Sequence, residues 1–261
     1  MSLSDQLDAM LETSGGRLGR MMNHYGLTLA KVTNIKDDKN FNRVKCLPIG
    51  AKDEEETDWC YVMSPMGGKG TGLFLFPQLG DLVVLAYLDD DPHRPLVLGS
   101  FWNTESTPPL SVKDGKNQDY CLRTPEKTEF LLHDESGKQK LTVTMPSGTV
   151  LVLDDEKQAV SVKDKSGDNA LLMDLKKGEV TLKAKTKLVL SAGETSVTLE
   201  QSGNITEKGS GTLKLDAANI EGKAKAKLAL KGATGEVKAD GSLTLSASGP
   251  ASVKGAVVKI N

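Results

Sequence analysis

Apolar residues alternate with polar ones along almost the whole second half of the chain, from residue 140 to residue 261. Apolar pairs separated by one position recur there, and Gly, Asp, Asn, Ser or Lys fill most of the gaps. A period of two places successive side chains on opposite faces of a β-strand, and regular turn residues separate short strands. This half is therefore predicted to be many short strands joined by tight turns. The pairs are Leu141/Val143, Val150/Val152, Val160/Val162, Leu171/Met173, Val180/Leu182, Leu188/Leu190, Val197/Leu199, Leu213/Leu215, Leu228/Leu230, Val237/Ala239, Leu243/Leu245 and Val258/Ile260.

The repeating region lacks large side chains. No Phe, Tyr or Trp follows Phe130, no Arg follows Arg123, and no Cys follows Cys121. A core of Val, Leu and Ala without aromatic rings suits a long, thin structure better than a globule. The repeats therefore predict a β-rod with an aliphatic core.

The first 24 residues carry a helical pattern. Ser4 is a suitable N-cap, and Leu3, Leu7, Met10 and Leu11 keep helical spacing. Two interpretations stay open for this segment. It either packs on the next domain or docks on a partner protein through those four residues.

Residues 25–103 are predicted to form a small closed barrel. Several strands follow one another without an intervening helix, which is typical of an OB-fold. Residues 104–126 are polar and contain Pro108-Pro109 and Asp114-Gly115, so they are interpreted as a linker. The repeating β region then occupies residues 127–261. The expected barrel strands are 27–32, 43–49, 59–63, 73–76, 82–88 and 95–101.

Composition excludes several functional classes. The 33 basic and 35 acidic residues give a net charge of −2, without the basic excess of a general nucleic-acid or membrane-surface binder. Cys46, Cys60 and Cys121 lack CxxC spacing and are interpreted as reduced thiols of a protein folded in the cytoplasm. No apolar run is long enough to span a membrane, and a signal peptide is not expected. Outside the cell, the protein would act after lysis or as part of a particle.

Two stretches invite a ligand-binding interpretation. The glycine-rich residues 67–72 lack the GKS/GKT ending and the following helix of a phosphate-binding loop, so a flexible inter-strand loop is favoured. Asp89-Asp90-Asp91-Pro92-His93 offers metal ligands, but it lies between two strands, where Asp and Pro commonly build turns. No metal site and no cofactor are predicted.

Catalysis is also not expected. His24, His93 and His133 lie in no nucleophile–base motif, and no large insertion interrupts the strands to provide a cleft. The Lys-rich residues 183–187 alternate with small residues and have no neighbouring Arg or aromatic residue, so they are assigned to the solvated face of strands. No catalytic residue and no nucleic-acid partner are predicted.

The stretch from residue 77 to 102 resembles a known family. Pro77-x-x-Gly80-Asp81-x-Val83-Val84, followed by Asp91-Pro92-x-Arg94-Pro95-x-Val97-x-Gly99-Ser100, is similar to the OB domain of central spike proteins of contractile injection systems. These include phage tail and baseplate spikes and the VgrG spikes of type VI secretion. Met63-Ser64-Pro65-x-Gly67 and Asp164-x-x-Gly167-x-Asn169 also resemble the family's barrel loop and β-helix.

The resemblance implies an all-β homotrimer, in which an OB barrel is followed by an intertwined triple-stranded β-helix needle. Many short phage spikes of this family end in a His-x-His pair that binds iron, whereas no His follows His133 here. The resemblance therefore implies a separate PAAR-like tip protein on Val257, Val258, Lys259, Ile260 and Asn261. The 24 residues before Tyr25 are too few for a hub domain, so a separate hub protein is also implied.

The sequence thus predicts a non-enzymatic trimeric spike that connects a hub to a tip protein and pierces a target cell envelope. It would assemble in the cytoplasm and become part of a virion or an extracellular injection particle. Two other hypotheses remain: a surface-binding module for a receptor or polysaccharide, and an OB-fold binder of single-stranded nucleic acid. The missing aromatics after Phe130 disfavour the first, and the acidic stretch 53–58 disfavours the second.

Overall fold

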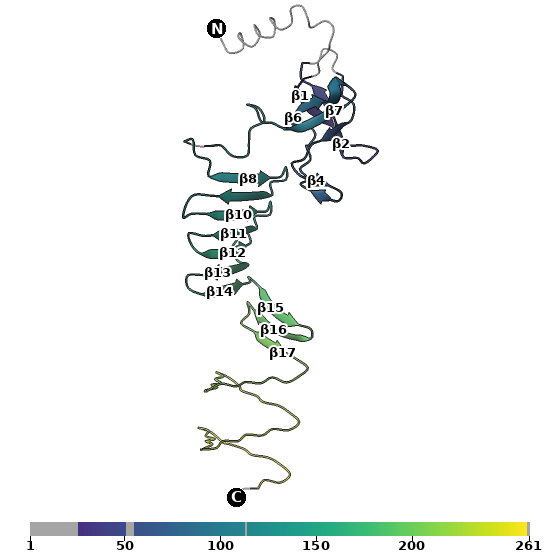
Figure 1. Cartoon of the computed structure of the whole chain (residues 1–261). Helices are drawn as coiled ribbons and strands as arrows, with labels where there is room; N and C mark the ends of the chain where they lie inside the picture. Colours follow the sequence, from purple (N-terminus) through teal and green to yellow (C-terminus); the bar gives the residue numbers. More distant parts are fainter. Residues whose placement is uncertain (1–25, 51–54, 113, 260–261) are drawn as a thin grey trace, which may run out of the picture. The chain divides into compact units, whose positions relative to one another are not determined.

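The regular secondary structure of the described residues is almost entirely β-strand, which confirms the all-β prediction (Figure 1). The computed structural model describes residues 26–50, 55–112 and 114–259. The predicted helical segment of residues 1–24 lies outside the described residues. The chain divides into two compact units between Thr186 and Lys187. Within the described ranges, the helical structure includes no segment long and apolar enough to cross a membrane.

A five-stranded closed barrel occupies the first part of the chain, as the OB-fold prediction requires. The strands close in the order β1-β2-β3-β7-β6. β3 and β7 pair in parallel, and the other neighbours pair antiparallel. The bounds are β1 (Thr28–Asn34), β2 (Arg43–Pro48), β3 (Cys60–Val62), β6 (Leu82–Tyr87) and β7 (Pro95–Ser100).

The barrel core is small, and every second side chain along each strand fills it. Every barrel strand contributes at least one fully buried residue, because alternate side chains point inward. Phe76 and Tyr87 pack against this core from its rim. The buried residues are Ala30, Val32, Val44, Cys46, Cys60, Val83, Leu85 and Val97.

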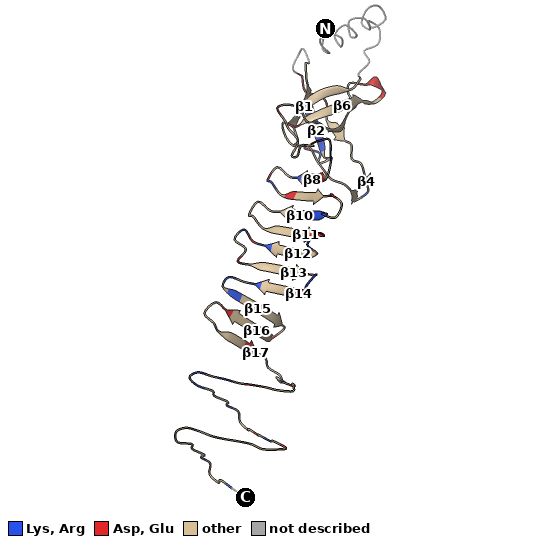
Figure 2. Ribbon diagram, turned by 90° about the vertical axis from the view of Figure 1, so that its left-hand side faces the viewer, with Lys and Arg blue, Asp and Glu red and all other residues tan. Residues whose placement is uncertain are grey.

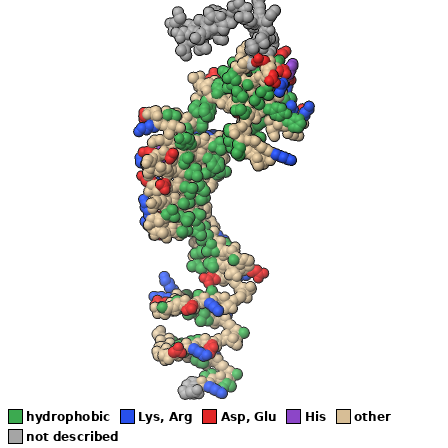
Figure 3. All heavy atoms as spheres, in the orientation of Figure 1, with side chains coloured by type: hydrophobic (Ala, Val, Ile, Leu, Met, Phe, Trp, Pro, Cys, Tyr) green, Lys and Arg blue, Asp and Glu red, His purple; other side chains and the backbone are tan. Residues whose placement is uncertain are grey.

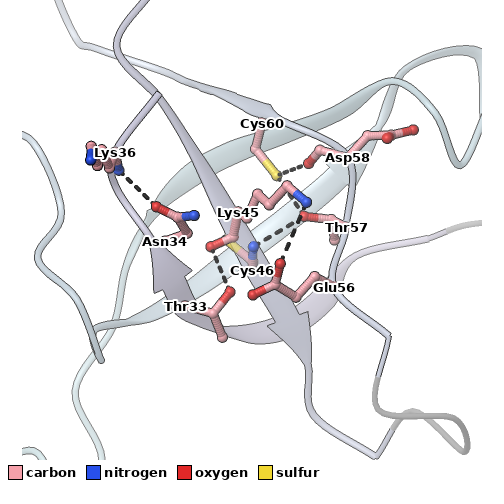
Figure 4. A network of polar contacts seen from close by, with 9 residues as sticks. All are labelled: Thr33, Asn34, Lys36, Lys45, Cys46, Glu56, Thr57, Asp58 and Cys60. Atoms are coloured by element: carbon pink, nitrogen blue, oxygen red, sulfur yellow. Dashed lines mark hydrogen bonds and ion pairs between the residues drawn. The ribbon is translucent and has the colours of Figure 1, made fainter. Parts of the chain in front are cut away.

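Two of the core residues are thiols held in a polar network (Figure 4). The Thr57 hydroxyl accepts a hydrogen bond from the Cys46 backbone N–H at 3.1 Å and lies 3.2 Å from Cys60 Sγ. The contact with Cys60 and burial raise the pKa of the Cys46 thiol, so it stays neutral. Cys46, Cys60 and Cys121 are free, as the sequence predicts for reduced thiols.

The glycine-rich stretch forms a short β-hairpin of β4 (Gly67–Gly68) and β5 (Thr71–Gly72). The expectation of a simple loop is thereby corrected: the chain pairs with itself. The acidic turn after β6 forms the short 3-10 helix η1 (Leu88–Asp90), in which Asp89 has a positive φ of 57°. Asp tolerates this conformation better than most residues, which explains an acidic turn at this position.

A seven-stranded antiparallel sheet follows the barrel, and each strand pairs with its neighbour in sequence. Figure 2 shows the strands stacked in order, with many of the charged residues near strand ends and turns. Every strand is five residues long. They are β8 (Asp119–Arg123), β9 (Glu129–His133), β10 (Lys140–Thr144), β11 (Val150–Asp154), β12 (Ala159–Lys163), β13 (Ala170–Asp174) and β14 (Glu179–Lys183). The first of them, β8, lies within residues 104–126, which were predicted to be a linker.

The second unit begins with a three-stranded antiparallel sheet of β15 (Lys187–Ala192), β16 (Thr195–Glu200) and β17 (Ile205–Lys208). Residues 209–259 follow as an extended trace that turns back repeatedly without forming strands (Figure 1). An intertwined needle predicts that strand edges pair mainly between chains. That expectation does not hold for β8–β17, because short turns bring consecutive strands of one chain together first.

One ion pair fixes the β1–β2 turn of the barrel. Arg43 Nε and Nη2 each donate to a carboxylate oxygen of Asp37 at 2.8 Å. The backbone N–H groups of Lys39 and Phe41 donate to the same carboxylate at 3.1 and 3.0 Å. The hydrogen bonds from Arg43, together with those from the turn, hold the pKa of Asp37 well below its usual value of 3.8.

We expect Asp37→Asn to weaken the barrel at neutral pH, because the amide replaces an ionised acceptor of four hydrogen bonds. A lowered folded-state pKa adds stability above the unfolded-state pKa, and this stability is lost as the pH falls toward the folded-state value. Urea unfolding, followed by tryptophan fluorescence, measures both effects. The stability difference between wild type and variant should be constant near neutrality and shrink below about pH 4.

Asp38→Asn makes the same charge change at the exposed neighbouring residue and serves as the control. Equal unfolding midpoints for the two variants at pH 7 would contradict a structural role for the Asp37 carboxylate.

Candidate functional site

The register of β8–β14 gathers apolar side chains on one face of the sheet. Each strand contributes two of them, and every cross-strand neighbour on this face is also apolar. We call this set the apolar face. It consists of Tyr120, Leu122, Phe130, Leu132, Leu141, Val143, Leu151, Leu153, Val160, Val162, Leu171, Met173, Val180 and Leu182.

None of these side chains is buried in the single chain. Tyr120 is 52% exposed and Val180 65% exposed, and those on the inner strands are at best half-buried. Figure 3 shows hydrophobic side chains gathered along one side of this sheet and charged ones along the other. A sheet with one apolar face needs a second layer, and the described part of this unit provides none over β8–β14.

The opposite face of the same sheet mixes polar and apolar residues, and we call it the mixed face. Thr142, Ser161 and Thr181 lie in its centre, and charged residues occupy most of its strand ends. His133 Nδ1 lies 2.7 Å from Asp119 Oδ1, and this contact raises the pKa of His133. Arg123 pairs with Glu129 at the neighbouring strand ends. The mixed face is therefore more polar than the apolar face, although Leu131, Val152 and Leu172 also lie in its centre.

The phase of one strand differs from the prediction. If each apolar pair found in the sequence pointed to one common face, Val150 and Val152 would lie on the same face as Leu141 and Val143. The register instead pairs Leu141 with Leu153 and Val143 with Leu151, so Val150 and Val152 lie on the mixed face. The run Val150-Leu151-Val152-Leu153 is apolar throughout, and only the length of the preceding turn decides which residues face which side.

Asp residues begin equivalent turns along one edge of the sheet. Asp154 Oδ1 accepts from the backbone N–H of Lys157 at 2.9 Å, and Asp174 Oδ1 accepts from that of Lys177 at 3.0 Å. These bonds lower the pKa of both carboxyls. Lys176 Nζ also donates to the carbonyl of Glu156, twenty residues earlier, at 2.9 Å. Each turn is thus closed internally and also connected to its neighbour.

The other edge has a similar arrangement around Asp164. Its carboxylate accepts from the Asn169 amide at 2.6 Å and from Ser166, and these bonds lower its pKa to about 2. Lys185 Nζ lies 2.9 Å from Asp168 Oδ2, which connects this turn to the next. The stretch that resembles the family's β-helix therefore builds a rigid turn.

The Lys-rich residues 183–187 lie where alternation predicts. Lys183 is on the mixed face opposite Ala170, and its Nζ donates to the carbonyl of Gly167 at 2.9 Å. In the second unit, Lys187 Nζ lies 3.4 Å from Glu200 Oε1. These lysines are engaged with the protein's own acceptors along the sheet edge.

The acidic turn Asp89–His93 is occupied by ion pairs. His93 Nδ1 lies 2.7 Å from Asp58 Oδ2, which raises the pKa of His93, and Arg94 pairs with Asp89. Among the residues that the structure describes, no group of three or more His, Cys, Asp or Glu side chains could hold a metal ion.

The two predicted partner surfaces lie at the ends of the chain. Leu3, Leu7, Met10 and Leu11, the candidate hub interface, are outside the described residues. Within the candidate tip interface, Val257 and Val258 are 75% and 50% exposed, and Lys259 is also exposed. Ile260 and Asn261 are outside the described residues. Sequence reasoning found most of the apolar residues of β8–β14 but not which of them share a face.

Comparison with known proteins identifies the barrel. Residues 28–102 match the type VI secretion system/phage-baseplate injector OB domain. The chain is 31% identical over 101 residues to the type VI secretion system spike protein VgrG5 of Pseudomonas aeruginosa, covering 36% of this chain and 13% of that protein. It is 26% identical over 98 residues to VgrG1a of the same organism, covering 35% and 15%.

A third relative carries a toxin name. The actin cross-linking toxin VgrG1 of Vibrio cholerae is 26% identical over 94 residues, covering 34% of this chain and 8% of the toxin. The chain thus spans less than a sixth of the length of each of these three relatives. Residues 28–102 are therefore similar to the OB domain of type VI secretion and phage-baseplate injectors, in a chain that resembles VgrG-like spike proteins.

Proposed function

We propose that the protein is the non-enzymatic, homotrimeric spike of a contractile injection particle. The apolar face of β8–β14 is the observation that carries this proposal. Three copies of this face, turned inward around one axis, would form a continuous, largely aliphatic core. The mixed face would then be the outer surface of the shaft. Catalysis has no part in this function, because force is generated elsewhere and the shaft only transmits it.

The dimensions of the sheet favour three chains over two. A five-residue strand spans about 17 Å, and two facing sheets pack about 10 Å apart. A two-sheet sandwich of such narrow sheets would leave its core open along both sides. Three sheets arranged as a triangular prism cover each other's sides, and two inward side chains per strand from each chain fill the narrow interior. Aliphatic residues fill most of this space, and the two aromatic rings of the apolar face, Tyr120 and Phe130, lie on its first two strands, β8 and β9.

Residues 209–259 differ from β8–β17 in a way that favours strand pairing between chains in this part of the shaft. Leu213, Leu228, Leu243 and Val258 recur every fifteen residues, and each is followed two positions later by another apolar residue. This is strand alternation, yet these described residues form no strand within one chain. Leu230 is 90% exposed and Leu245 85% exposed. Pairing with the other two copies would satisfy their backbone groups, so we propose that the three chains intertwine here.

The ends of the shaft would contact other proteins. We propose that a separate hub protein binds the OB end, with Leu3, Leu7, Met10 and Leu11 as candidate contacts. A PAAR-like tip protein would bind residues 257–261. The exposed Val257 and Val258 are compatible with such a contact. The assembled spike would form in the cytoplasm, join a virion or extracellular injection particle, and pierce a target cell envelope.

Mass in solution tests the proposed function directly. We expect the purified chain to have the mass of a trimer by light scattering, and to remain a trimer on unheated SDS gels. Interlocked chains dissociate slowly, since many strands must separate before any copy leaves. A monomer by both measurements would refute the spike proposal.

Leu182→Asp tests whether the apolar face is the trimer core. Leu182 is 49% exposed in one chain, so a monomer tolerates the carboxylate. Burial in a trimer would cost at least about 2 kcal/mol per chain, from the lost leucine and the desolvated charge. We expect the SDS-resistant trimer to dissociate at a much lower temperature.

Thr181→Asp is the matched control for this variant, because Thr181 is exposed on the mixed face of the same strand, β14. The trimer should survive this substitution. Equal loss of the trimer in both variants would show that the apolar face is not its core.

Deletion of residues 257–261 tests the tip contact. We expect the full-length chain, expressed with its native gene neighbours, to co-purify with a small PAAR-like protein, and the shortened chain to lose it. The shortened chain should remain a trimer, because the deleted residues form only the last part of the shaft. Retention of the small protein would show that it binds elsewhere.

A further inference from the structure

The β4–β5 hairpin belongs to a rigid projection from the barrel, residues 63–76, which we call the apolar arm. The Ser64 hydroxyl lies 2.7 and 2.9 Å from the carbonyl oxygens of Leu73 and Met66, between which its one O–H donates, and this closes the base of the hairpin. Gly72 has a φ of 147°, and a Cβ there would lie 2.6 Å from the Met66 carbonyl oxygen. Only Gly fits this position, so the arm has a sequence-specified shape.

The surface of this arm is apolar and exposed. Met66 is 62% exposed, Phe74 71% and Leu75 58%. The Phe74 ring stacks on Phe76 at 5.6 Å between centroids, and Phe76 packs against the barrel core. The arm is thus fixed to the barrel at its root, while its outer side chains lie in water. A shaped apolar surface of this kind is typical of an interface.

A second exposed surface lies on β2, β3 and the turn before β2. Phe41 and Tyr61 are 57% and 56% exposed. The Arg43 guanidinium lies 5.2, 5.6 and 5.8 Å from the ring centroids of Phe41, Trp59 and Tyr61. We call these four residues the aromatic patch. Three rings held around one cation form a fixed contact surface.

The charges of the aromatic patch are already neutralised. Both donor groups of Arg43 that face Asp37 are used by its carboxylate. Lys45 Nζ lies over the Trp59 ring at 5.8 Å and 3.4 Å from Glu56 Oε2. A phosphate backbone would have to displace these acids, which disfavours nucleic acid as the partner. The patch instead offers ring faces to an apolar or thioether-bearing surface.

Rotational symmetry explains why one barrel carries both surfaces. Around a threefold axis, contacts between neighbours are heterologous, so each copy needs two different, complementary surfaces. Three shafts on one axis also bring three barrels to the same end of the axis. We infer that the apolar arm of one copy packs on the aromatic patch of the next, closing a ring of three barrels. This inference rests on the proposed trimer and assigns it a second interface.

Paired cysteines test this contact in the full chain. Phe74→Cys and Tyr61→Cys are combined in a Cys121→Ser background, because Cys46 and Cys60 are buried and Cys121 is only partly so. Both altered side chains are exposed, so the barrel core is untouched. On mild oxidation with copper phenanthroline, we expect most of the chain to become covalent dimers and trimers on boiled, non-reducing SDS gels.

Each single-cysteine variant is the matched control and should remain a monomer on the same gels, since like positions do not meet in a ring of three. Light scattering on the same samples separates the possible failures. A trimeric mass without cross-links, or a cross-link within one chain, overturns the arm–patch contact and leaves the shaft trimer intact. A monomeric mass overturns both. Equal cross-linking of a single-cysteine variant also overturns it, because the contact would then be between like surfaces.

Discussion

A single-layer sheet with one apolar face is the constraint on which the rest of this structure depends. Each large aliphatic side chain gains about 1.5–3 kcal/mol when it moves from full exposure to full burial. The apolar face carries two large apolar side chains on each of seven strands, and most of them are aliphatic. The free energy gained from even partial burial of these side chains exceeds the free energy of unfolding of a typical domain, which is roughly 5–15 kcal/mol. Covering this face is therefore the dominant energetic requirement of the chain.

The sequence predicts the elements well and their faces less well. Five of the six expected barrel strands and the strands β10–β16 follow from alternation, whereas the expected strand 73–76 and the strands expected within residues 209–259 do not form. The phase of β11 does not follow from alternation, because Leu151 and Leu153 are as apolar as Val150 and Val152. Only the turn between β10 and β11 fixes the register, and turn geometry is a weaker signal than hydrophobic periodicity.

The pairing of β8–β17 within one chain was also not predicted from the sequence. Short connections favour pairing between neighbours in one chain, because closing a small loop costs little entropy. β8–β17 follow this rule. From residue 209 the repeat lengthens to fifteen residues, and the described residues no longer pair within the chain. The aromatic patch was missed for a different reason: Phe41, Arg43, Trp59 and Tyr61 are separated by turns, and only the barrel brings them together.

The sheet suits the transmission of force along the direction in which its strands stack. Hydrogen bonds between neighbouring strands point along that direction, so compression loads each strand pair through several bonds at once. Successive turns are connected at one edge by the hydrogen bond from Lys176 to the Glu156 carbonyl and at the other by the ion pair between Lys185 and Asp168. Bending of the sheet would have to stretch one edge and break these side-chain interactions. The proposed shaft of three such sheets would resist buckling, because each side-chain bond between turns opposes displacement of the turn beside it and the apolar core would hold the sheets together.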